Sequence, residues 1–598
     1  MQNRITTHIF PAIVLASAFA AMLAWTWFGW PDPVVDFGRE LYVPWRLSEG
    51  DALYRDIAYF NGPLSPYFNA LAMKLFGVSL ATIVALNLVI LALLVAMVYR
   101  LMLLVGDRLA ATLAGLLLVC VFAFLQLGGI GNYNFITPYS HEITHGITLS
   151  FAALLCVKNF VRTARTTWAA GAGLVLGLVF LTKPEVFLAA GGAVAVGILV
   201  TLRSRRVSRK YALAVLGQFA ASVLVAPIVA GALLLIRIAP IDAVRGVLGG
   251  WLYLFDPRIN QMKFYQRVFG TLSLANTAHS MIIDAIWYAA LAAVVTAVAL
   301  TLRARWRGSP WVFAVALLLS SAGMCGIYQL VPTSEWQIAF RGLSIVMVAI
   351  VIALLVWTAR LRRSTGAIED RAILRLIFAT FALLLLGKVL LNVLLYHYGF
   401  ALAMPAAMVV VAAIASWGPQ IIDRMGGSGH VVRAAAVALV GLVIFVHLRV
   451  YQAIYAQRDV PVGAGRDRFR ARDARGLAVD RMVEVLHKLP PGATVATVPE
   501  GVMINYLARR VNPTGYINLM PPEVVMFGQR RILDAFERHP PDYVVLVLGS
   551  DPGDYGFKSF AIDYGREVHA SILDHYRRVP TPSEARVREF PLLLLERK

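Results

Sequence analysis

Residues 31–77 read PDPVVDFGRELYVPWRLSEGDALYRDIAYFNGPLSPYFNALAMKLFG, and they separate the first two apolar segments of the chain. Charged side chains stand among many aromatic ones in this stretch: Asp36, Arg39, Glu40, Arg46, Glu49, Asp51, Arg55 and Asp56. Connections inside a compact domain are usually short, and long ones tend to carry function. We therefore interpret residues 31–78 as the first outer loop of a membrane protein and as half of an active site.

Composition sets the class of protein. Of 598 residues, 59% are hydrophobic and 15% charged, and the mean hydropathy is +0.69. These values exclude a disordered chain and indicate a polytopic α-helical membrane protein. The net charge of +21 falls in short clusters between apolar runs, as cytoplasmic loops do under the positive-inside rule. It therefore reports topology, and no nucleic-acid partner is predicted.

The alternation of apolar runs and basic clusters predicts the topology. The first span, residues 9–30, is long enough for a bilayer and lacks a small-residue cleavage site, so it should remain as an anchor. Basic clusters lie at residues 100–108, 158–165, 203–210, 303–307, 360–375 and 424–433. If all are cytoplasmic, the chain has about 13 spans, with its N-terminus inside and its C-terminus outside. The outer loops are then 31–78, 131–141, 239–282, 331–341 and 395–399.

The hydropathy changes after Tyr451. Helix-like stretches (471–487, 523–538, 565–577) alternate with β-like runs (494–498, 543–548, 587–595). We therefore expect two domains, a transmembrane catalytic domain at residues 1–451 and a small soluble α/β domain at residues 452–598. The segment PEGVMINYLARRVNP, residues 499–513, predicts a strand-to-helix turn with a polar tip. That turn either contacts the substrate or belongs to a stabilising cap.

Two acidic sites fall in outer loops. Asp36 and Glu40 are four residues apart, so on an interfacial helix they would share one face, and a carboxylate there can act as general base. The alternative is a helix cap or a salt bridge to Arg39. The next outer loop ends in His141, Glu142 and His145, an H-E-x-x-H pattern that on a helix could bind zinc. No motif elsewhere in the sequence supplies a third ligand, and Ser140 can cap a span that begins with His141.

Cations also lie near the predicted outer ends of spans. Lys183 stands in LTKPE, between two short apolar segments, where it could bind a phosphate or extend to lipid headgroups. Lys388 lies near the outer end of the eleventh span, and His397 and Tyr398 follow in the turn after it. Ionisable groups at such depths are functional candidates, although they could also join helices.

The chain resembles the GT-C glycosyltransferases. The resemblance covers roughly residues 1–450 and depends on an Asp in a long first outer loop, the pattern LSEGDALYRDIAYFNGPLSPYFNALAMKLFG, an acidic residue at the start of the fourth span, and LTKPE. It is strongest with the bacterial branch related to protein mannosyltransferases and the lipid A aminoarabinose transferase. It implies a GT-C-like fold and a polyprenyl-phosphate-linked sugar donor.

The resemblance assigns roles to single residues. The first-loop Asp falls on Asp36, the second acidic position on Glu142 and the loop Lys on Lys183. Protein mannosyltransferases commonly carry an adjacent Asp-Glu pair in the first loop. Here Asp36 is followed by Phe37, with Glu40 the nearest glutamate. This departure argues against protein O-mannosylation and leaves the base role intact.

We therefore predict a membrane glycosyltransferase that moves a sugar from a polyprenyl-phosphate donor to an acceptor hydroxyl on the outer face, with inversion. Asp36 and Glu142 are the predicted catalytic residues. The donor phosphate is assigned to Lys183, Lys388 and His397. The acceptor is assigned to Glu40, His141 and Tyr398. No cofactor is required; His141 and Glu142 orient the acceptor or hold a divalent cation, Mg²⁺ or Mn²⁺.

The expected setting is the bacterial inner membrane, with a lipid or glycan as acceptor, membrane lipids around the spans and the C-terminal domain in the periplasm or outside the cell. Three other functions stay open. A transporter or flippase would need a site at the bilayer midplane. An oligosaccharide ligase would need an Arg-rich outer loop, and 239–282 has only Arg245, Arg258 and Arg267. The third function, suggested by the H-E-x-x-H pattern, is that of an intramembrane metalloprotease.

Overall fold

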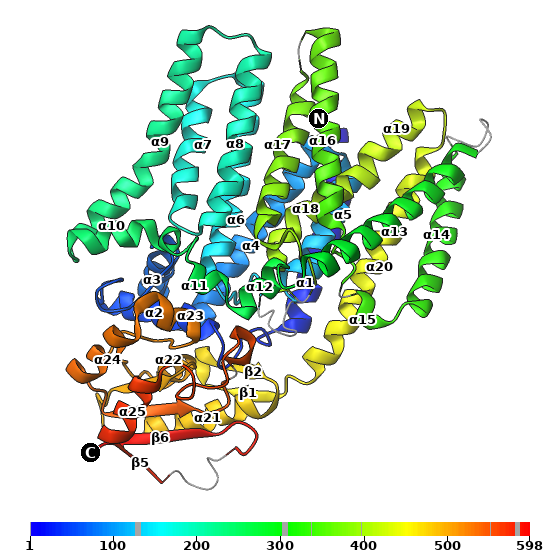
Figure 1. The fold of residues 1–598 in the computed structure, drawn as a ribbon. Helices are drawn as coiled ribbons and strands as arrows, with labels where there is room; N and C mark the ends of the chain where they lie inside the picture. Colours follow the sequence, from blue (N-terminus) through cyan, green and yellow to red (C-terminus); the bar gives the residue numbers. More distant parts are fainter. Residues whose placement is uncertain are drawn as a thin grey trace.

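The computed structural model of the chain describes all residues except 1, 126–132, 302–308, 337, 367, 396, 551 and 581–586. Long helices run side by side in one layer, and a smaller domain with a β-sheet lies against one end of them (Figure 1). Of the predicted outer-loop and basic segments, the following lie outside the described part: Gly131, Asn132, Gln337, Ala367, Tyr396 and the cluster at 303–307.

Eleven described segments are long and apolar enough to cross a membrane. They are residues 9–26 of α1 (Gln2–Thr26), α4 (Leu80–Val105), α6 (His141–Thr163), α8 (Pro184–Ser204), α9 (Arg209–Leu235), α12 with α13 (Lys263–Phe269, Leu274–Thr301), residues 311–330 of α14 (Pro310–Leu330), α16 (Leu343–Thr365), α17 (Asp370–Leu385) with η4 (Leu386–Val389), η5 (Phe400–Ala403) with α18 (Met404–Ala412), η6 (Ala413–Trp417) and α19 (Gly418–Arg424), and α20 (Gly429–Ala456). Two shorter apolar stretches, α5 (Arg108–Leu117) with η1 (Leu118–Ala123) and α7 (Thr166–Phe180), bring the count to the predicted 13. The prediction of a polytopic helical membrane protein is confirmed.

Four of the basic loops meet at one end of the helices. Arg205 donates from Nη2 to the carbonyl oxygen of Arg162 at 3.0 Å, and the amide of Ile368 donates to Ser204 Oγ at 3.0 Å. Arg375 donates from Nε to the carbonyl oxygen of Val105 at 2.8 Å. These contacts join the loops at 100–108, 158–165, 203–210 and 360–375, as the charge pattern predicts.

The chemically mixed loops meet at the opposite end, together with the C-terminal domain (Figure 1). The first of them forms two helices, α2 (Phe37–Glu49) and α3 (Leu64–Phe76). The amide of Gly62 donates to the carbonyl oxygen of Thr182 at 3.3 Å, and the amide of Ala58 donates to that of Gly515 at 3.0 Å. Further short helices lie at this end: α10 (Pro240–Leu248), η2 (Gly249–Leu252), α11 (Pro257–Asn260) and α15 (Thr333–Trp336).

The C-terminal domain is built on a four-stranded sheet in the order β3-β4-β6-β5. Strands β3 (Val495–Val498) and β4 (Tyr543–Val547) are parallel, and β6 (Leu592–Arg597) runs antiparallel to β4 and to β5 (Tyr576–Arg578). A small ribbon pairs β1 (Val460–Val462) with β2 (Phe469–Ala471). The helical elements of this domain are η7 (Gly465–Asp467), α21 (Asp473–His487), α22 (Met503–Leu507), α23 (Pro521–Phe527), α24 (Gln529–Arg538), η8 (Pro552–Tyr555) and α25 (Arg566–His575). The predicted soluble α/β fold is confirmed, whereas β1, β2 and β5 were not predicted.

The predicted division at residue 451 falls inside α20, which continues to Ala456. The C-terminal domain contacts the first outer loop, and hydrophobic side chains of both parts form one continuous cluster that includes Trp45 and Tyr506. Because this interface is extensive, the division into two independent domains stays a prediction.

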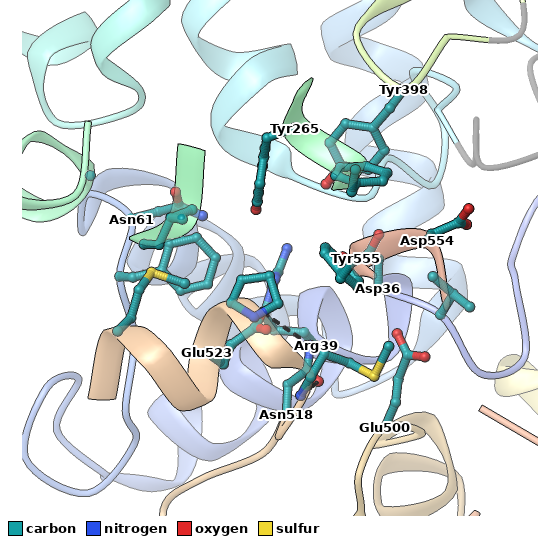
Figure 2. A pocket seen from close by; sticks show the side chains of 18 of the residues that line it. Asp36, Arg39, Asn61, Tyr265, Tyr398, Glu500, Asn518, Glu523, Asp554 and Tyr555 are labelled. Carbon is teal, nitrogen blue, oxygen red and sulfur yellow. Dashed lines mark hydrogen bonds between the residues drawn. The ribbon is translucent and has the colours of Figure 1, made fainter. Parts of the chain in front are cut away.

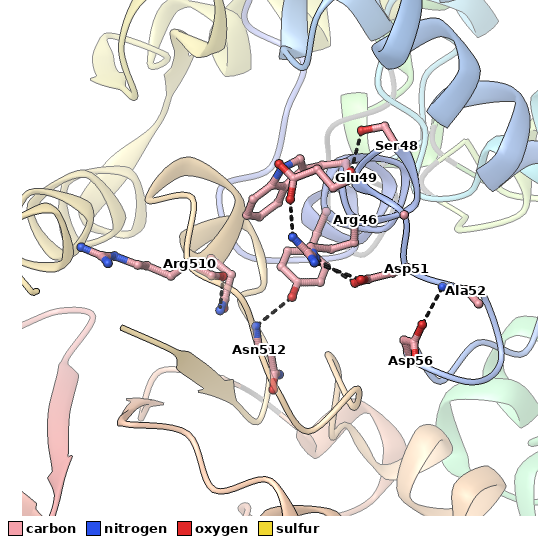
Figure 3. Close-up of polar contacts among 12 residues, drawn as sticks. Arg46, Ser48, Glu49, Asp51, Ala52, Asp56, Arg510 and Asn512 are labelled. Atoms are coloured by element: carbon pink, nitrogen blue, oxygen red, sulfur yellow. Dashed lines mark hydrogen bonds and ion pairs between the residues drawn. The ribbon is translucent and has the colours of Figure 1, made fainter. Parts of the chain in front are cut away.

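Helix α2 makes a polar contact with the C-terminal domain. The amide of Asn512 donates to the Tyr42 hydroxyl at 2.8 Å (Figure 3). Arg46 holds the end of α2 to the following loop, since it pairs with Glu49 and lies 2.8 Å from Asp51 (Figure 3). The first outer loop and the C-terminal domain therefore pack as one unit.

Candidate active site

A cavity of about 590 Å³ lies between the membrane helices and the C-terminal domain (Figure 2). Its polar lining from the membrane part includes Asp36, Arg39, Asn61, Lys183, Glu185, Tyr265, Lys388 and Tyr398. Its polar lining from residue 458 onward includes Arg458, Arg472, Arg475, Glu500, Asn518, Glu523, Asp554 and Tyr555. Four of the eight predicted site residues therefore meet here: Asp36, Lys183, Lys388 and Tyr398.

Asp36 is placed by the turn before α2. The Asp32 carboxylate accepts the amides of Val34 and Val35 at 2.9 and 2.8 Å, which fixes the turn. Asp36 follows with φ +57° and ψ −58°, in a region that costs a residue with a Cβ on the order of 1–3 kcal/mol. The backbone bends sharply at this point, and Asp36 lines the cavity directly before the first turn of α2.

The Asp36 carboxylate is available for chemistry. It accepts no hydrogen bond from the residues that the structure describes. Burial raises the pKa of Asp36 to about 6, against the opposing attraction of the Arg39 charge. A carboxylate with a pKa in this range is ionised at neutral pH and can still accept a proton, which suits a general base.

Glu40 does not share the face of Asp36, contrary to the prediction. Asp36 lies outside the helix, whereas Glu40 is in its first turn and accepts from His141 Nδ1 at 2.6 Å and from Arg39 Nε at 3.1 Å. The hydrogen bond to His141 and the charge of Arg39 lower the pKa of Glu40 to about 2 despite its burial. Neither Glu40 nor His141 lines the cavity. They support Arg39, which also donates to the Tyr139 carbonyl oxygen at 2.7 Å.

Glu142 is likewise away from the cavity lining. It is fully buried in the first turn of α6, where its carboxylate accepts from the Tyr59 and Ser140 hydroxyl groups. The predicted catalytic contact of Glu142 therefore does not fit this geometry. The two hydroxyl groups complete its hydrogen bonds, and Glu142 fastens α6 to the first outer loop.

Lys183 presents its ammonium group to the cavity. It precedes Pro184, which begins α8, and so takes the extended backbone that a residue before proline favours. Its Nζ lies 5.3 Å from the centre of the Tyr139 ring and makes no hydrogen bond or ion pair with any described residue. Burial and the charge of Lys388 lower the pKa of Lys183 to about 8. An anion in the cavity would supply the missing partner.

Lys388 lines the same cavity, and it already has a partner. Its Nζ donates to Glu185 Oε1 at 2.8 Å. Glu185 is in the first turn of α8 and Lys388 is in η4, so this ion pair joins the start of α8 to the segment after α17. The pair leaves Lys183 as the stronger candidate for an incoming phosphate.

His397 and Tyr398 have different surroundings in the structure. The His397 ring is bound through Nε2 to the Val268 carbonyl oxygen at 3.0 Å and through Nδ1 to the Gly399 amide at 2.8 Å. Burial lowers the pKa of His397 to about 4, so it is neutral and unsuited to the predicted phosphate role. Tyr398 lines the cavity, and its ring lies 3.8 Å from that of Tyr139, centre to centre.

The histidines of the H-E-x-x-H pattern contact other side chains of the same chain. Both ring nitrogens of His141 are engaged, Nδ1 with Glu40 and Nε2 with the Asn87 side-chain amide at 2.9 Å. His145 Nδ1 lies 2.9 Å from Ser65 Oγ. Among the described residues no three His, Cys, Asp or Glu side chains are placed to share a metal ion. Residues His141 and Glu142 therefore do not fit the predicted cation site or a protease zinc site.

Sequence reasoning missed Glu500 and Glu523. Both lie in the C-terminal domain, line the cavity and are more than nine-tenths buried. Burial raises the pKa of Glu523 to about 7 and that of Glu500 well above its usual range. Glu500 belongs to the turn predicted at residues 499–513, and the polar tip of that turn was the signal that could have identified it. No pattern in the sequence indicated Glu523.

The family model described as dolichyl-phosphate-mannose-protein mannosyltransferase matches residues 61–230. The resemblance to GT-C glycosyltransferases is confirmed. The matched segment contains Glu142 and Lys183 and begins after Asp36. A search of curated protein sequences found no match.

Several solved GT-C structures are similar to the chain. The oligosaccharyltransferase of Archaeoglobus fulgidus, in its apo form, is 14% identical with a TM-score of 0.48, over 90% of this chain and 69% of that one. ArnT from Cupriavidus metallidurans, bound to undecaprenyl phosphate, is 12% identical with a TM-score of 0.42, over 98% of each chain.

Proposed function

We propose that the chain transfers a sugar from a polyprenyl-phosphate donor to an acceptor hydroxyl group, with inversion at the anomeric carbon. One observation carries the proposal: the Asp36 carboxylate and the Lys183 ammonium group, both without partners among the described residues, line one cavity at the end of the membrane helices. The family match over residues 61–230 supports the same reaction class.

Asp36 is the proposed general base. In the reaction it takes the proton of the acceptor hydroxyl, the oxygen forms a bond to the anomeric carbon, and the bond from that carbon to the phosphate oxygen breaks on the opposite face. The electron pair of the broken bond leaves with the polyprenyl phosphate. Asp36 then returns the proton to solvent through the cavity.

Lys183 is the proposed partner of the leaving phosphate. The phosphate gains negative charge as the bond breaks, and a fixed ammonium group in a partly apolar site stabilises that charge. Lys388 contributes a second positive charge, reduced by Glu185, which lies 2.8 Å away. A phosphate leaves readily, so a general acid is not needed.

Arg39, Glu40, His141 and Glu142 are proposed positioning residues. Arg39 lies beside Asp36, and the Glu40–His141 contact fixes its guanidinium group against α6. Glu142 fastens Tyr59, in the loop after α2, to the start of α6. These contacts hold the first outer loop, which carries Asp36 directly before α2, against the start of α6.

The proposed setting is the bacterial inner membrane, with the cavity and the C-terminal domain on the outer side and a lipid or glycan as acceptor. The testing experiment reconstitutes the full chain with a radiolabelled polyprenyl-phosphate sugar and candidate lipid and glycan acceptors. We expect label in an acceptor and release of polyprenyl phosphate, with the product anomer opposite to the donor anomer by NMR. Retention of the anomer, or transport of the donor without cleavage, would refute the mechanism.

A further inference from the structure

The cavity has two chemically different walls. Lys183 and Lys388 come from the membrane part, and we call them the basic wall. Glu500 and Glu523 come from the C-terminal domain, and we call them the acidic wall (Figure 2). Asp36 lies between them on the first outer loop. The proposed function accounts for the basic wall and leaves the acidic wall without a role.

Glu500 is the central observation. Its exposed fraction is 8%, and it makes no hydrogen bond or ion pair with the described residues. Figure 2 shows its carboxyl group directed into the space below Asp36 and Asp554. A largely buried carboxyl group without a protein partner can complete its hydrogen bonds only with what enters the cavity. Its position indicates a ligand that supplies hydrogen bonds.

Glu523 presents a second carboxyl group to the same space. It is held in place by Asn518, whose Nδ2 donates to Glu523 Oε1 at 3.1 Å, and Asn518 also lines the cavity. Burial raises the pKa of both carboxyl groups, which favours their protonated form. A protonated carboxyl group donates one hydrogen bond and accepts others, which matches a hydroxyl group.

Aromatic rings complete this end of the cavity. The centre of the Tyr555 ring lies 5.0 Å from that of Phe264 and 6.3 Å from that of Tyr265. Arg267 on α12 forms an ion pair with Asp554 at 2.9 Å, which fixes the two segments to each other. Aromatic faces beside hydrogen-bonding side chains suit a ligand with both apolar C–H faces and hydroxyl groups.

The charges of this wall disfavour an anionic ligand. Asp36 raises the pKa of both Glu500 and Glu523, and Glu523 raises that of Glu500, so an ionised Asp36 would repel a further negative charge at this wall. Four arginines line the cavity, and each has another partner. Arg39 pairs with Glu40. Arg458 donates to the carbonyl oxygens of Gly29, Pro31 and Arg470, Arg475 pairs with Asp32 and Asp473, and Arg472 pairs with Asp473.

We propose that the acidic wall is the acceptor site and that it takes an uncharged carbohydrate, whose hydroxyl groups bind Glu500 and Glu523 and whose ring faces Tyr265 or Tyr555. This inference deepens the proposed function and rests on it, because the bound hydroxyl group must lie within reach of Asp36. Phosphorylated or carboxylated acceptor groups are excluded from this wall.

The test measures binding of methyl glycosides to the full-length protein by saturation-transfer NMR, without turnover. The probes are neutral methyl hexopyranosides, the corresponding methyl hexuronides and methyl 2-amino-2-deoxyhexosides. We expect at least one neutral probe to bind ten times more tightly than its uronide and its amino analogue. Glu500→Leu and Glu523→Leu should each weaken that binding about tenfold, and Glu500→Gln should retain most of it, since an amide also donates and accepts.

Glu567→Leu, an exposed change on α25 of the same domain, is the control and should not alter binding. Equal binding of the uronide, preference for the amino probe, or unchanged binding by both leucine variants would overturn the inference. Binding of undecaprenyl phosphate is measured in parallel and should be the same in all variants. If the wild type does not bind it, the proposed function fails, and the glycoside result still decides whether the acidic wall recognises carbohydrate.

Discussion

Gly38 on α2 packs against the backbone of Met503 on α22, so closely that a Cβ atom at residue 38 would lie 2.4 Å from the Met503 nitrogen. Asp36 is two residues before Gly38, and Glu500 is three residues before Met503. This contact therefore sets the distance between the proposed base and the acidic wall of the cavity. Only glycine allows the two helices to approach in this way.

Gly38→Ala should move α2 away from α22 and displace Asp36. Because backbone must shift, we expect a loss of about 1–3 kcal/mol in stability, the usual cost of overpacking, together with slower transfer. Thermal unfolding and transfer rates of the purified protein measure both effects. Gly441→Ala in α20 is the matched control, since a Cβ there meets nothing within 4 Å. Equal stability and rate for the two variants would contradict the role of Gly38.

The membrane part could be predicted because its determinants are local in sequence. Apolar length and basic clusters predicted the spans, the first outer loop indicated Asp36, and LTKPE between two short apolar segments indicated Lys183. The surroundings of Glu142 and His397 differ from the prediction, because their partners, Tyr59, Ser140 and Val268, are determined by tertiary packing. Glu523 was missed since its position depends on how the C-terminal domain packs on α2, which no local pattern in one sequence encodes.

The orientation of the chain in the membrane can be measured directly. The charge bias predicts Arg205 in the cytoplasm and Ser550 outside. Reporter fusions after these two residues should show opposite sides, with phosphatase activity only at Ser550. Because Ser550 lines the cavity, an inside signal there would place the chemistry on the cytoplasmic face and refute the proposed outer-face reaction.

The H-E-x-x-H pattern should be structural. Purified protein is expected to contain no stoichiometric zinc by metal analysis, because both ring nitrogens of His141 have protein partners. His145→Ala should lower stability by roughly 2 kcal/mol, since it leaves a cavity and removes the contact with Ser65, and should keep at least about half of the transfer rate. Tightly bound zinc that is lost on changing either histidine would restore the protease interpretation.

The pH dependence of kcat/KM for transfer should be bell-shaped. Asp36 must be ionised to accept a proton, and its pKa is about 6, so kcat/KM should fall as the pH drops through 6. Lys183 must be protonated to hold phosphate, and its pKa is about 8, so kcat/KM should fall as the pH rises through 8.

The alkaline limb of the kcat/KM profile tests whether Lys183 is the group that titrates there. Lys183→Arg should move it to higher pH, because a guanidinium group stays charged across the whole range. Lys558→Arg, an exposed change in the C-terminal domain, should leave the profile unchanged. If the alkaline limb of Lys183→Arg stayed near pH 8, the group that titrates there would be another one.

The last prediction separates the proposed base from the proposed phosphate partner. Asp36→Asn removes the proton acceptor and nearly keeps its shape, so transfer should fall about 10²-fold or more, the usual scale for a general base. Binding of the polyprenyl-phosphate donor should change little, because Asp36 acts on the acceptor hydroxyl. Asp574→Asn, an exposed change on α25, is the matched control and should be fully active.

Lys183→Ala should behave differently, because its charge attracts phosphate in the ground state as well as in the transition state. We expect donor binding to weaken and transfer to slow in the same variant, so that kcat/KM falls more than kcat. Equilibrium binding of undecaprenyl phosphate and single-turnover rates separate the two effects, with Lys558→Ala as the control. Full activity of Asp36→Asn would show that Asp36 is not the general base. Normal donor binding by Lys183→Ala would show that Lys183 does not bind the phosphate. Both results together would require a mechanism in which neither residue contacts the reacting groups, although both line the cavity without partners among the described residues.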